Sequence, residues 1–302
     1  MSTRLLRQIR TAIEQLNPHD VRMAAERPVS IVLHAFDSPS YAEMEDFFAP
    51  AGVSHKKRLE VVEYLFREGD PDAPPEADLH VIDRELALQV GGDGMDLPAG
   101  TFVYDRERPH MLIHGVLEAK QDLGLPLARA FPPFRGVVSQ RTIHQVSKEN
   151  AVFALATALP GIAPGILSLP WAIPEAMSDT AVLTVNQIRM AFLLAAASDR
   201  PVGYREQKME VAGIIAGAFG WRALARNLVS KVPFGGGLLP KAAIAYAATY
   251  VEGRSLERLY GRGYGLTRKE RSLEYGTAMT KGRQVVGAIF DAWQQRRTKA
   301  VR

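Results

Sequence analysis

The hexapeptide FPPFRG, residues 131–136, separates two parts of the sequence that follow different patterns. Before it, β-rich segments alternate with helical segments, which is typical of a small α/β domain. After it, strand patterns are hard to find and one long helical pattern follows another. The sequence therefore predicts an α+β protein, in which a small α/β domain over 20–130 precedes an apolar all-α helical domain over 137–265.

The α/β part carries three predicted strands and several helices. The strand segments are PVSIVLHAF at 28–36, LHVIDRELALQV at 79–90, which is expected to end in a short helix, and TFVYD at 101–105. One amphipathic helix is expected over 54–68, SHKKRLEVVEYLFRE, with Ser54 as its N-cap. Pro109 is expected at the start of another helix, where its missing N–H is tolerated.

The first 19 residues predict a separate amphipathic helix. Leu5, Ile9, Ile13 and Leu16 fall on one helical stripe, with arginines on the other faces. Two interpretations stay open: the stripe packs on the helix's own domain, or it lies in a membrane interface. This end lacks the apolar run and cleavage site of a secretory signal, so we expect a cytoplasmic chain.

Length, cysteine content and charge limit what the protein can be. A chain of 302 residues with 47% hydrophobic content allows two modest domains, and the absence of cysteine excludes disulfides and thiolate chemistry. Residues 1–150 carry 17 basic and 23 acidic side chains, whereas residues 151–302 carry 20 and 10. Residues 253–302 carry 12 basic and 4 acidic side chains. A basic segment beside an apolar one indicates an anionic membrane surface or nucleic acid as partner.

The C-terminal half is expected to consist of long helices and a basic tail. Helices are predicted over 137–160, 178–199, 204–232 and 240–260, followed by a basic helical tail over 266–302.

The run Ala151–Pro174 contains no charged residue over 24 positions, which is long enough to span a bilayer. It contains four prolines, and a straight spanning helix tolerates them poorly because each internal proline removes a hydrogen bond. The run is therefore either a buried hairpin in a soluble helical domain or a re-entrant hairpin that dips into a membrane.

Three consecutive glycines, Gly235–Gly237, suggest a phosphate-binding loop, but the surrounding residues do not fit one. Lys241 follows a proline instead of a glycine, and Ala242 stands where the magnesium-binding hydroxyl belongs. The segment DSPSYAEMED, which follows the first predicted strand, has neither glycine nor lysine. We therefore interpret 235–237 as a glycine-rich connection between helices and expect no nucleotide cofactor.

No catalytic or metal-binding constellation is predicted. His110, His114 and Glu118 share one helical face, but Met111 stands where a zinc-protease motif needs glutamate, so a solvated or partly buried face is expected. The GGDGMD segment lacks the spacing of a calcium loop and is interpreted as a turn.

A polar stripe crosses the apolar helix over 178–199. Asp179, Asn186 and Arg189 are separated by seven and three residues, which places them along one side. Three interpretations stay open: a solvated stripe, a structural Asp–Arg network, or a polar seam that faces another helix inside the apolar domain.

The basic C-terminal segment provides the candidate membrane-surface contacts. Arg254, Arg258 and Arg262 recur every four residues and so line one helix face. Farther on, Trp293 ends an apolar stripe, and Arg296 and Arg297 follow it. The competing interpretation is a tail that packs on its own domain or on a second subunit.

Residues of the C-terminal half resemble a known family. The elements are Gln187 and Met190, the turn with Pro233 and Gly236, the helix segment containing Thr249 and Gly253, and the closing Tyr260. Over about 150–262 the sequence resembles the YcjF/GTPase-associated bacterial domain of unknown function. The resemblance implies a helical, membrane-associated module that often follows a GTPase domain, and it carries over no catalytic residue.

The leading functional hypothesis is a non-enzymatic, membrane-associated interaction or scaffold protein on the cytoplasmic face, peripheral to or inserted in the inner membrane. The alternative is a degenerate or atypical nucleotide-binding (GTPase-like) protein, or a hydrolase with an unrecognised site in the α/β domain. A protein partner or self-association is compatible with both. Aromatic residues for base stacking are sparse in the tail, which argues against nucleic acid.

Overall fold

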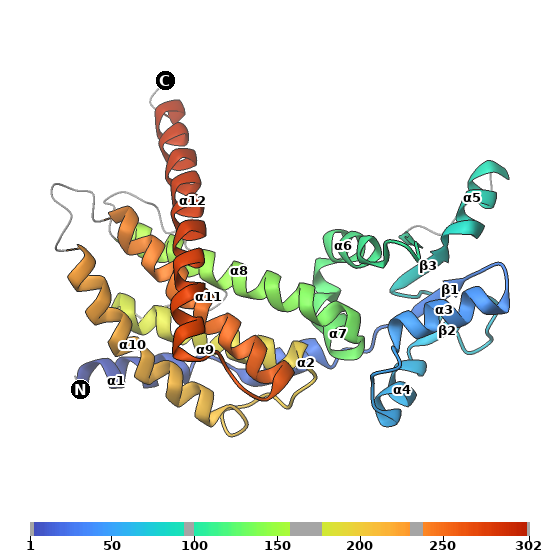
Figure 1. Cartoon of the computed structure of the whole chain (residues 1–302), viewed down its shortest axis with the longest axis horizontal. Helices are drawn as coiled ribbons and strands as arrows, with labels where there is room; N and C mark the ends of the chain where they lie inside the picture. The colour runs from blue at the N-terminus through green and yellow to red at the C-terminus, as the bar shows by residue number, and fades with distance from the viewer. Residues whose placement is uncertain (1–2, 94–99, 158–176, 230–237, 301–302) are drawn as a thin grey trace. The chain divides into compact units, whose positions relative to one another are not determined.

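The computed structural model of the protein describes residues 3–93, 100–157, 177–229 and 238–300. A small sheet lies in the N-terminal part and long helices make up the C-terminal part, which confirms the predicted α+β class (Figure 1). The chain divides into two compact units. The sheet unit comprises Arg22–Ser139 and Ala196–Asp199, and the helical unit comprises Met1–Val21, Gln140–Ala195 and Arg200–Arg302.

Within the described residues, four parallel strands form one sheet. They are β1 (Ile31–His34), β2 (Leu65–Arg67), β3 (Leu79–Asp83) and β4 (Thr101–Tyr104), in the order β2-β1-β3-β4. Ile31 of β1 stands opposite Leu65 on one side and Leu79 on the other. The chain thus moves outward from β1 in one direction and from β3 in the other, as in doubly wound sheets.

The sequence predicts β1, β3 and β4 but not β2. The helix expected over 54–68 is wrong in its second half, because α4 (His55–Val62) ends after 8 residues and β2 follows. The Ile31 N–H donates to the Tyr64 carbonyl and the Glu68 N–H donates to the Leu33 carbonyl, both at 2.9 Å. A longer α4 would leave this edge of β1 without hydrogen-bond partners.

Helices join the strands and begin at recognisable caps. Asp37 caps α3 (Ser38–Phe48) by accepting a hydrogen bond from the Ser40 N–H at 2.9 Å. The predicted cap Ser54 accepts one from the Lys57 N–H at 3.3 Å. Other helices here are α2 (Pro18–Ala25), α5 (Arg84–Asp93), α6 (Pro109–Ala119), the 3-10 helix η1 (Gln121–Leu123) and α7 (Gly124–Ala130), with Pro109 in the first turn of α6 as predicted.

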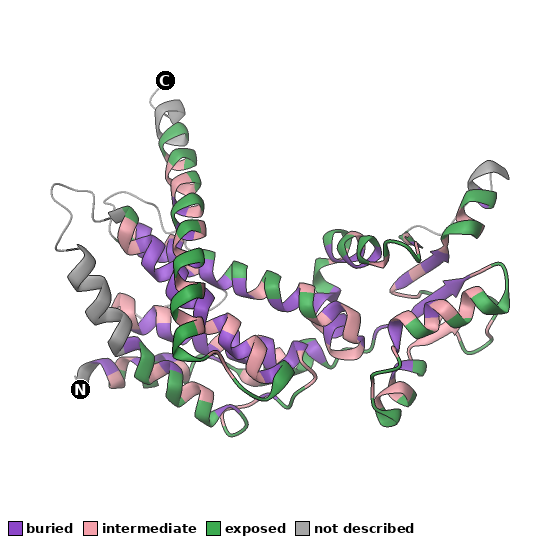
Figure 2. Cartoon of the chain, viewed as in Figure 1, coloured by how far each residue is buried: buried purple, intermediate pink, exposed green. Residues whose placement is uncertain are grey.

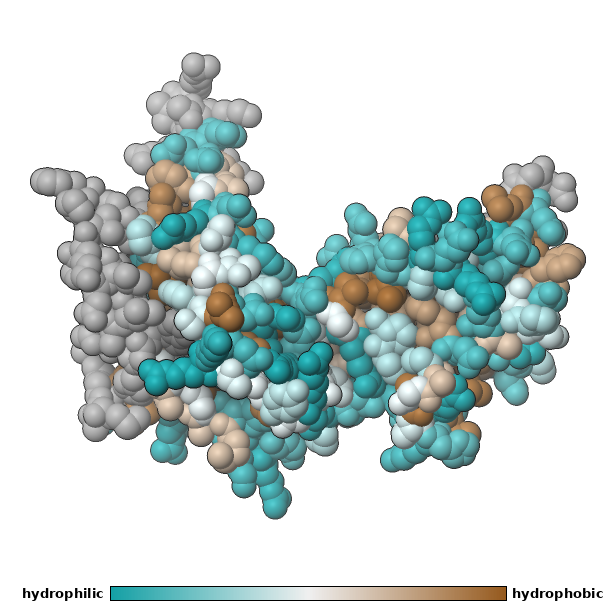
Figure 3. Space-filling model, in the orientation of Figure 1, coloured by the Kyte–Doolittle hydropathy of each residue, from teal (hydrophilic) through white to brown (hydrophobic). Residues whose placement is uncertain are grey.

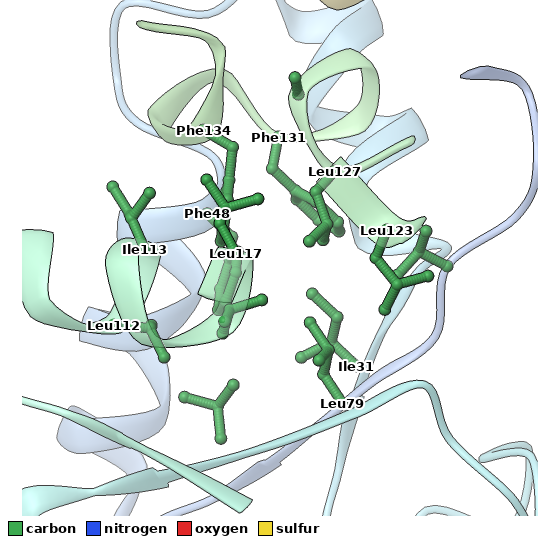
Figure 4. Packing of buried hydrophobic residues seen from close by; sticks show 14 of the residues in the cluster. Ile31, Phe48, Leu79, Leu112, Ile113, Leu117, Leu123, Leu127, Phe131 and Phe134 are labelled. Atoms are coloured by element: carbon green, nitrogen blue, oxygen red, sulfur yellow. The ribbon is translucent and has the colours of Figure 1, made fainter. Parts of the chain in front are cut away.

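One face of the sheet carries the core of the sheet unit. Ile31 and Leu33 of β1 and Leu79 and Val81 of β3 point to this face, since alternate strand residues share a side. Figure 4 shows the sheet residues facing side chains of the helices, with Phe48 of α3 among them. Burying each such side chain stabilises the fold by about 1.5–3 kcal/mol.

The hexapeptide FPPFRG lies inside the sheet unit and contributes to its core. Phe131 and Phe134 are wholly buried, and Pro132 and Pro133 begin α8 (Pro132–Ala156). Proline suits a first helical turn because the N–H groups there have no intrahelical partner. The prolines therefore break the sequence pattern without ending a domain, and the chain enters the helical unit within α8, after Ser139.

Two buried helices form the centre of the helical unit. α9 (Asp179–Ala197) and α11 (Leu238–Arg262) are mostly purple in Figure 2, and every residue of α11 from Ala242 to Val251 is buried. A helix that is buried on nearly all sides belongs to a core, and the polar side chains that it carries there need partners. The unit also contains α1 (Thr3–Ile13), the rest of α8, α10 (Lys208–Val229) and α12 (Arg268–Ala300).

The apolar stripe of α1 is buried inside the helical unit. Leu5, Ile9 and Leu16 are buried. The Tyr204 hydroxyl lies 2.6 Å from the Ile13 carbonyl oxygen and 2.8 Å from that of Leu16. Of the two interpretations for this helix, the structure supports packing on its own unit.

α12 packs along α11 and is not a detached tail. Ala278 and Val286 are buried, and a Cβ on Gly282 would stand 2.9 Å from the Ala243 carbonyl oxygen. Glycine at 282 therefore lets the two helices approach closely. Between them, Gly263 takes a φ of 86° and ends α11. We refer to α11, α12 and their connection as the hairpin.

Several predicted features lie partly or wholly outside the described residues. They include residues 158–174 of the uncharged run, residues 94–96 of the GGDGMD segment, the Pro233 and Gly236 turn, and the glycines at 235–237. The choice between a buried and a re-entrant hairpin for the uncharged run therefore stays a prediction.

We expect Gly253→Ala to destabilise the helical unit. A Cβ at this position of α11 would stand 2.8 Å from Ile143 Cγ1 and 3.0 Å from Met190 Sδ, so neighbours must shift. Overpacking of this kind costs about 1–3 kcal/mol. Gly276→Ala is the matched control, because nothing lies within 4 Å of its Cβ position. Urea unfolding followed by circular dichroism compares them, and equal midpoints would contradict the close approach.

Candidate functional site

Asn186 and Arg189 of the predicted polar stripe meet on one side of α9. The Asn186 amide donates to Glu149 Oε2 at 3.1 Å and to Asn150 Oδ1 at 2.9 Å. Arg189 Nε donates to Asn186 Oδ1 at 2.9 Å, and its Nη2 donates to Glu149. The stripe therefore faces α8, and the cation of α9 pairs with a carboxylate of α8.

The same cluster continues to α11. The Asn150 amide donates to Thr249 Oγ1 at 2.8 Å, and the Gln187 amide donates to the same oxygen at 3.1 Å. We call Glu149, Asn150, Asn186, Gln187, Arg189 and Thr249 the polar network. Its members bond one another across three helices, and buried polar groups that are satisfied in this way fix how helices align. The arrangement is suited to packing and not to reaction chemistry.

Asp179 is separate from the polar network. Its Oδ2 accepts hydrogen bonds from Lys241 Nζ at 2.5 Å and from Thr157 Oγ1 at 3.1 Å. At 1.5 Å of rise per residue, Asp179 lies about 15 Å from Arg189 along the helix, so the two cannot pair. The structure thus brings two of the three predicted stripe residues together and gives the third other partners.

The arginines predicted to line a membrane-facing side of α11 turn toward α12 instead. Arg254 pairs with Glu257 on its own helix and lies 4.0 Å from Glu274 of α12. Arg258 Nη1 donates to Glu270 Oε1 at 2.5 Å, and this hydrogen bond helps to lower the pKa of Glu270 to about 2. The two guanidinium groups therefore help to hold the hairpin together.

The other predicted membrane contacts are placed differently. Arg262 is exposed beside Tyr264, and it helps to lower the pKa of the Tyr264 hydroxyl together with Arg258. Trp293 is half-buried, with its ring 5.7 Å from that of Phe290. Arg296 and Arg297 belong to the end of α12, where side chains are outside the described part of the structure.

The carboxyl edge of the sheet is where doubly wound folds bind ligands, next to the point where the winding changes direction. That point lies between β1 and β3. At the start of α3, directly after β1, the Asp37 carboxylate accepts the Ser40 N–H, and this bond lowers the pKa of Asp37. A phosphate approaching this helix start would meet the negative charge of Asp37, and the Ser40 N–H there already donates to that carboxylate.

Two histidines and a glutamate form a chain of contacts at the sheet. His34 Nδ1 lies 3.3 Å from Glu68 Oε2, and His34 Nε2 lies 3.0 Å from His80 Nδ1. Burial, with a contribution from His34, lowers the pKa of His80. Neutral rings can share one N–H···N bond, so the arrangement suits a proton relay that begins at Glu68. His34 falls within the first predicted strand segment, and the sequence alone does not reveal its two partners.

The histidine face of α6 holds no such arrangement. His110, His114 and Glu118 are all exposed, as expected for a solvated face. Among the described residues, no group of three or more acidic or histidine side chains could hold a metal ion.

A pocket of about 580 Å³ lies in the sheet unit, near α2, α4 and α7. Its charged lining residues are Glu26, Arg27, Lys56, Lys57, Glu60, Arg129 and Asp199. Both signs of charge are present, and Lys57 pairs with Glu60 and Asp199 while Arg129 pairs with Glu26, so the pocket favours no single charge class of ligand.

Asp199 organises the positive side of this pocket. Its carboxylate forms an ion pair with Lys57 Nζ at 2.8 Å and accepts a hydrogen bond from Arg135 Nη2 at 3.4 Å, and Arg129 Nη1 lies 3.9 Å away. Asp199 has a φ of 57° just after α9, a position where glycine is usual. Aspartate is one of the few residues besides glycine that adopt this left-handed conformation, and here it also supplies a counter-charge to the three cations.

No protein-family model, curated protein or solved structure matches the chain. The resemblance of residues 150–262 to the YcjF/GTPase-associated domain therefore stays a prediction.

Arg189→Met should lower the free energy of unfolding by about 2–4 kcal/mol, because Glu149 would remain largely buried without its cation. The double variant Glu149→Gln/Arg189→Met removes the stranded charge and keeps an acceptor for Asn186, so it should recover much of the loss. Chemical denaturation of both variants measures the difference. A single variant that unfolds like the wild type would show that the ion pair does not support packing.

GTP and ATP with magnesium should give no saturable heat in isothermal titration calorimetry with the full chain. The reason is that the Asp37 carboxylate caps the start of α3, and its negative charge would repel an incoming phosphate. Micromolar affinity in the wild type, lost in Asp83→Ala at the end of β3, would contradict this expectation and establish a nucleotide site.

Proposed function

We propose that the protein is a non-enzymatic interaction or scaffold protein that associates with an anionic membrane on the cytoplasmic face. The observation that supports it most is the positive charge that remains on the hairpin after its internal ion pairs are formed. The proposed partner is therefore a surface of negative charge, and the proposed location is the inner membrane.

The internal pairs of the hairpin use its glutamates. Residues 253–302 carry 12 basic and 4 acidic side chains. Glu257 and Glu270 pair with Arg254 and Arg258, and Glu274 lies near Arg254 as well. Most of the net positive charge consequently belongs to residues that these pairs do not involve. Among the described side chains they are Arg262, Arg268 and Lys269 at the helix connection and Lys281 and Arg283 along α12, whereas Arg271 pairs with Glu252 of α11.

Peripheral attachment is the mode we propose. Within the described residues, α9 is the one helix that is long and apolar enough to cross a membrane by length and composition. However, 78% of that window is buried inside the protein, where α9 bonds α8 and α11 through the polar network. A core helix of a soluble unit passes the same test, so α9 supports no insertion.

The visible face of the sheet unit gives no argument for apolar attachment through that unit. Figure 3 shows a largely hydrophilic face over the sheet unit, with hydrophobic residues in small groups. Isolated apolar side chains of this kind are normal on protein surfaces and mark no large interface by themselves.

A second candidate function is a ligand-binding or hydrolytic role at the carboxyl edge of the sheet. The parallel order β2-β1-β3-β4 favours it, as does the contact between His34 at the end of β1 and Glu68 after β2, with His80 beside His34 but farther from this edge. If Glu68 accepts the Nδ1 proton of His34, then His34 Nε2 accepts from His80, and His80 Nε2 is left as a base. The calorimetry with nucleotides tests the GTPase-like form of this alternative.

The full chain should float with liposomes that contain anionic lipid and remain unbound with purely zwitterionic liposomes. Binding should rise with the anionic fraction and weaken between low salt and about 0.5 M salt, because surface charges are screened over about 10 Å at 0.1 M.

The experiment uses the intact chain because removing α12 would uncover the buried side of α11. A protein that stays unbound in every lipid mixture at low salt would rule out the membrane proposal.

A further inference from the structure

We propose that the connection between α11 and α12 is the surface that contacts the anionic membrane, an inference that rests on the function proposed above. The contact residues are Arg262, Tyr264, Arg268, Lys269 and Leu273, which we call the connection patch. Its occupant is a bilayer surface that contains anionic lipid headgroups.

The ion pairs of the hairpin decide which basic residues can serve this role. Arg254 and Arg258 are engaged by glutamates and are only partly exposed. A headgroup that bound Arg258 would have to displace Glu270 and so loosen the hairpin, and one that bound Arg254 would have to displace Glu257 of the same helix. Arg262, Arg268 and Lys269 are exposed and flank the connection, so a headgroup can approach them without breaking those pairs.

Two exposed hydrophobic side chains accompany these cations. Tyr264 is 54% exposed and Leu273 is 67% exposed. Tyrosine is enriched at the level of lipid headgroups, and a leucine beside it can enter the boundary with the acyl chains. The connection therefore offers a group for each layer of a membrane surface. The cations suit the anionic headgroups, the tyrosine ring suits the headgroup level, and the leucine suits the boundary with the acyl chains.

The connection is held in one shape before any partner arrives. Thr267 and Glu270 form a capping box, in which the Thr267 N–H donates to Glu270 Oε2 at 2.8 Å and the Glu270 N–H donates to Thr267 Oγ1 at 3.3 Å. The Arg258 guanidinium lies 4.9 Å from the Tyr264 ring centre. The Leu266 N–H donates to Ser255 Oγ at 3.1 Å. Binding therefore requires little ordering of the chain.

The first test is the triple variant Arg262→Gln/Arg268→Gln/Lys269→Gln in the full chain. Each basic residue near an anionic surface contributes about fivefold in partition, so we expect a loss on the order of a hundredfold on anionic liposomes. The control variant Arg10→Gln/Lys56→Gln/Arg106→Gln removes the same charge from side chains that are 84%, 88% and 82% exposed. It should bind within about fivefold of the wild type, and thermal melts check that both variants fold.

The second test uses the absence of cysteine from the chain. A polarity-sensitive dye is attached to Leu273→Cys and, as a control, to Leu88→Cys of the sheet unit, where the native leucine is 70% exposed. Anionic liposomes should shift the emission of the dye to shorter wavelength at position 273 and leave it unchanged at 88.

The outcomes separate this proposal from the function on which it rests. If the wild type binds no liposome, the membrane function itself is wrong. If the triple variant binds like the wild type, or the dye at 273 does not respond while the protein is bound, the connection patch is not the contact surface. A triple variant that binds normally but changes its mass in light scattering would identify the patch as an interface between two copies.

Discussion

The helical unit depends on the need to satisfy polar side chains that three helices bring into its core. Asn150 and Asn186 are wholly buried, and an amide left without partners there would cost about 1–3 kcal/mol. One alignment of α8, α9 and α11 lets Asn150 reach both Asn186 and Thr249. The close passage of Gly253 between Ile143 and Met190 belongs to that same alignment. The same alignment affects the surface charge of the hairpin. It sets which side of α11 packs against α12, and therefore which arginines of α11 pair with glutamates of α12.

The hairpin shows why surface charge is a product of packing. Arg254 and Arg258 are four residues apart, and so are Glu270 and Glu274 on the antiparallel partner helix. The two rows face each other and cancel locally. Among the described side chains, the basic residues outside these ion pairs lie at the helix connection and along α12. A count of charges by sequence segment therefore gives the net charge of a segment but not which of its side chains are paired.

Much of the fold is readable from the sequence, because long periodic helices and short β-rich runs carry strong signals. Strand β2 is not predicted from the sequence, because it has 3 residues and follows α4 almost directly, so the helical pattern extends over it. The partners of Asn186 and Arg189 are not predictable from the sequence, because Glu149 belongs to another helix and a single sequence does not show which helices are in contact. The sequence does contain a signal for the ion pairs of the hairpin, because Arg254 and Arg258 have the same four-residue spacing as Glu270 and Glu274. That signal can be interpreted only when α11 and α12 are known to be neighbours.

The two units are interleaved along the chain, and this constrains the order in which a ribosome can complete them. The helical unit claims α1 at the beginning and residues 200–302 at the end, with Tyr204 contacting the carbonyls of Ile13 and Leu16. Most of the sheet unit is synthesised between these parts. During translation the carbonyls of Ile13 and Leu16 therefore meet their Tyr204 partner only after about two-thirds of the chain has been synthesised.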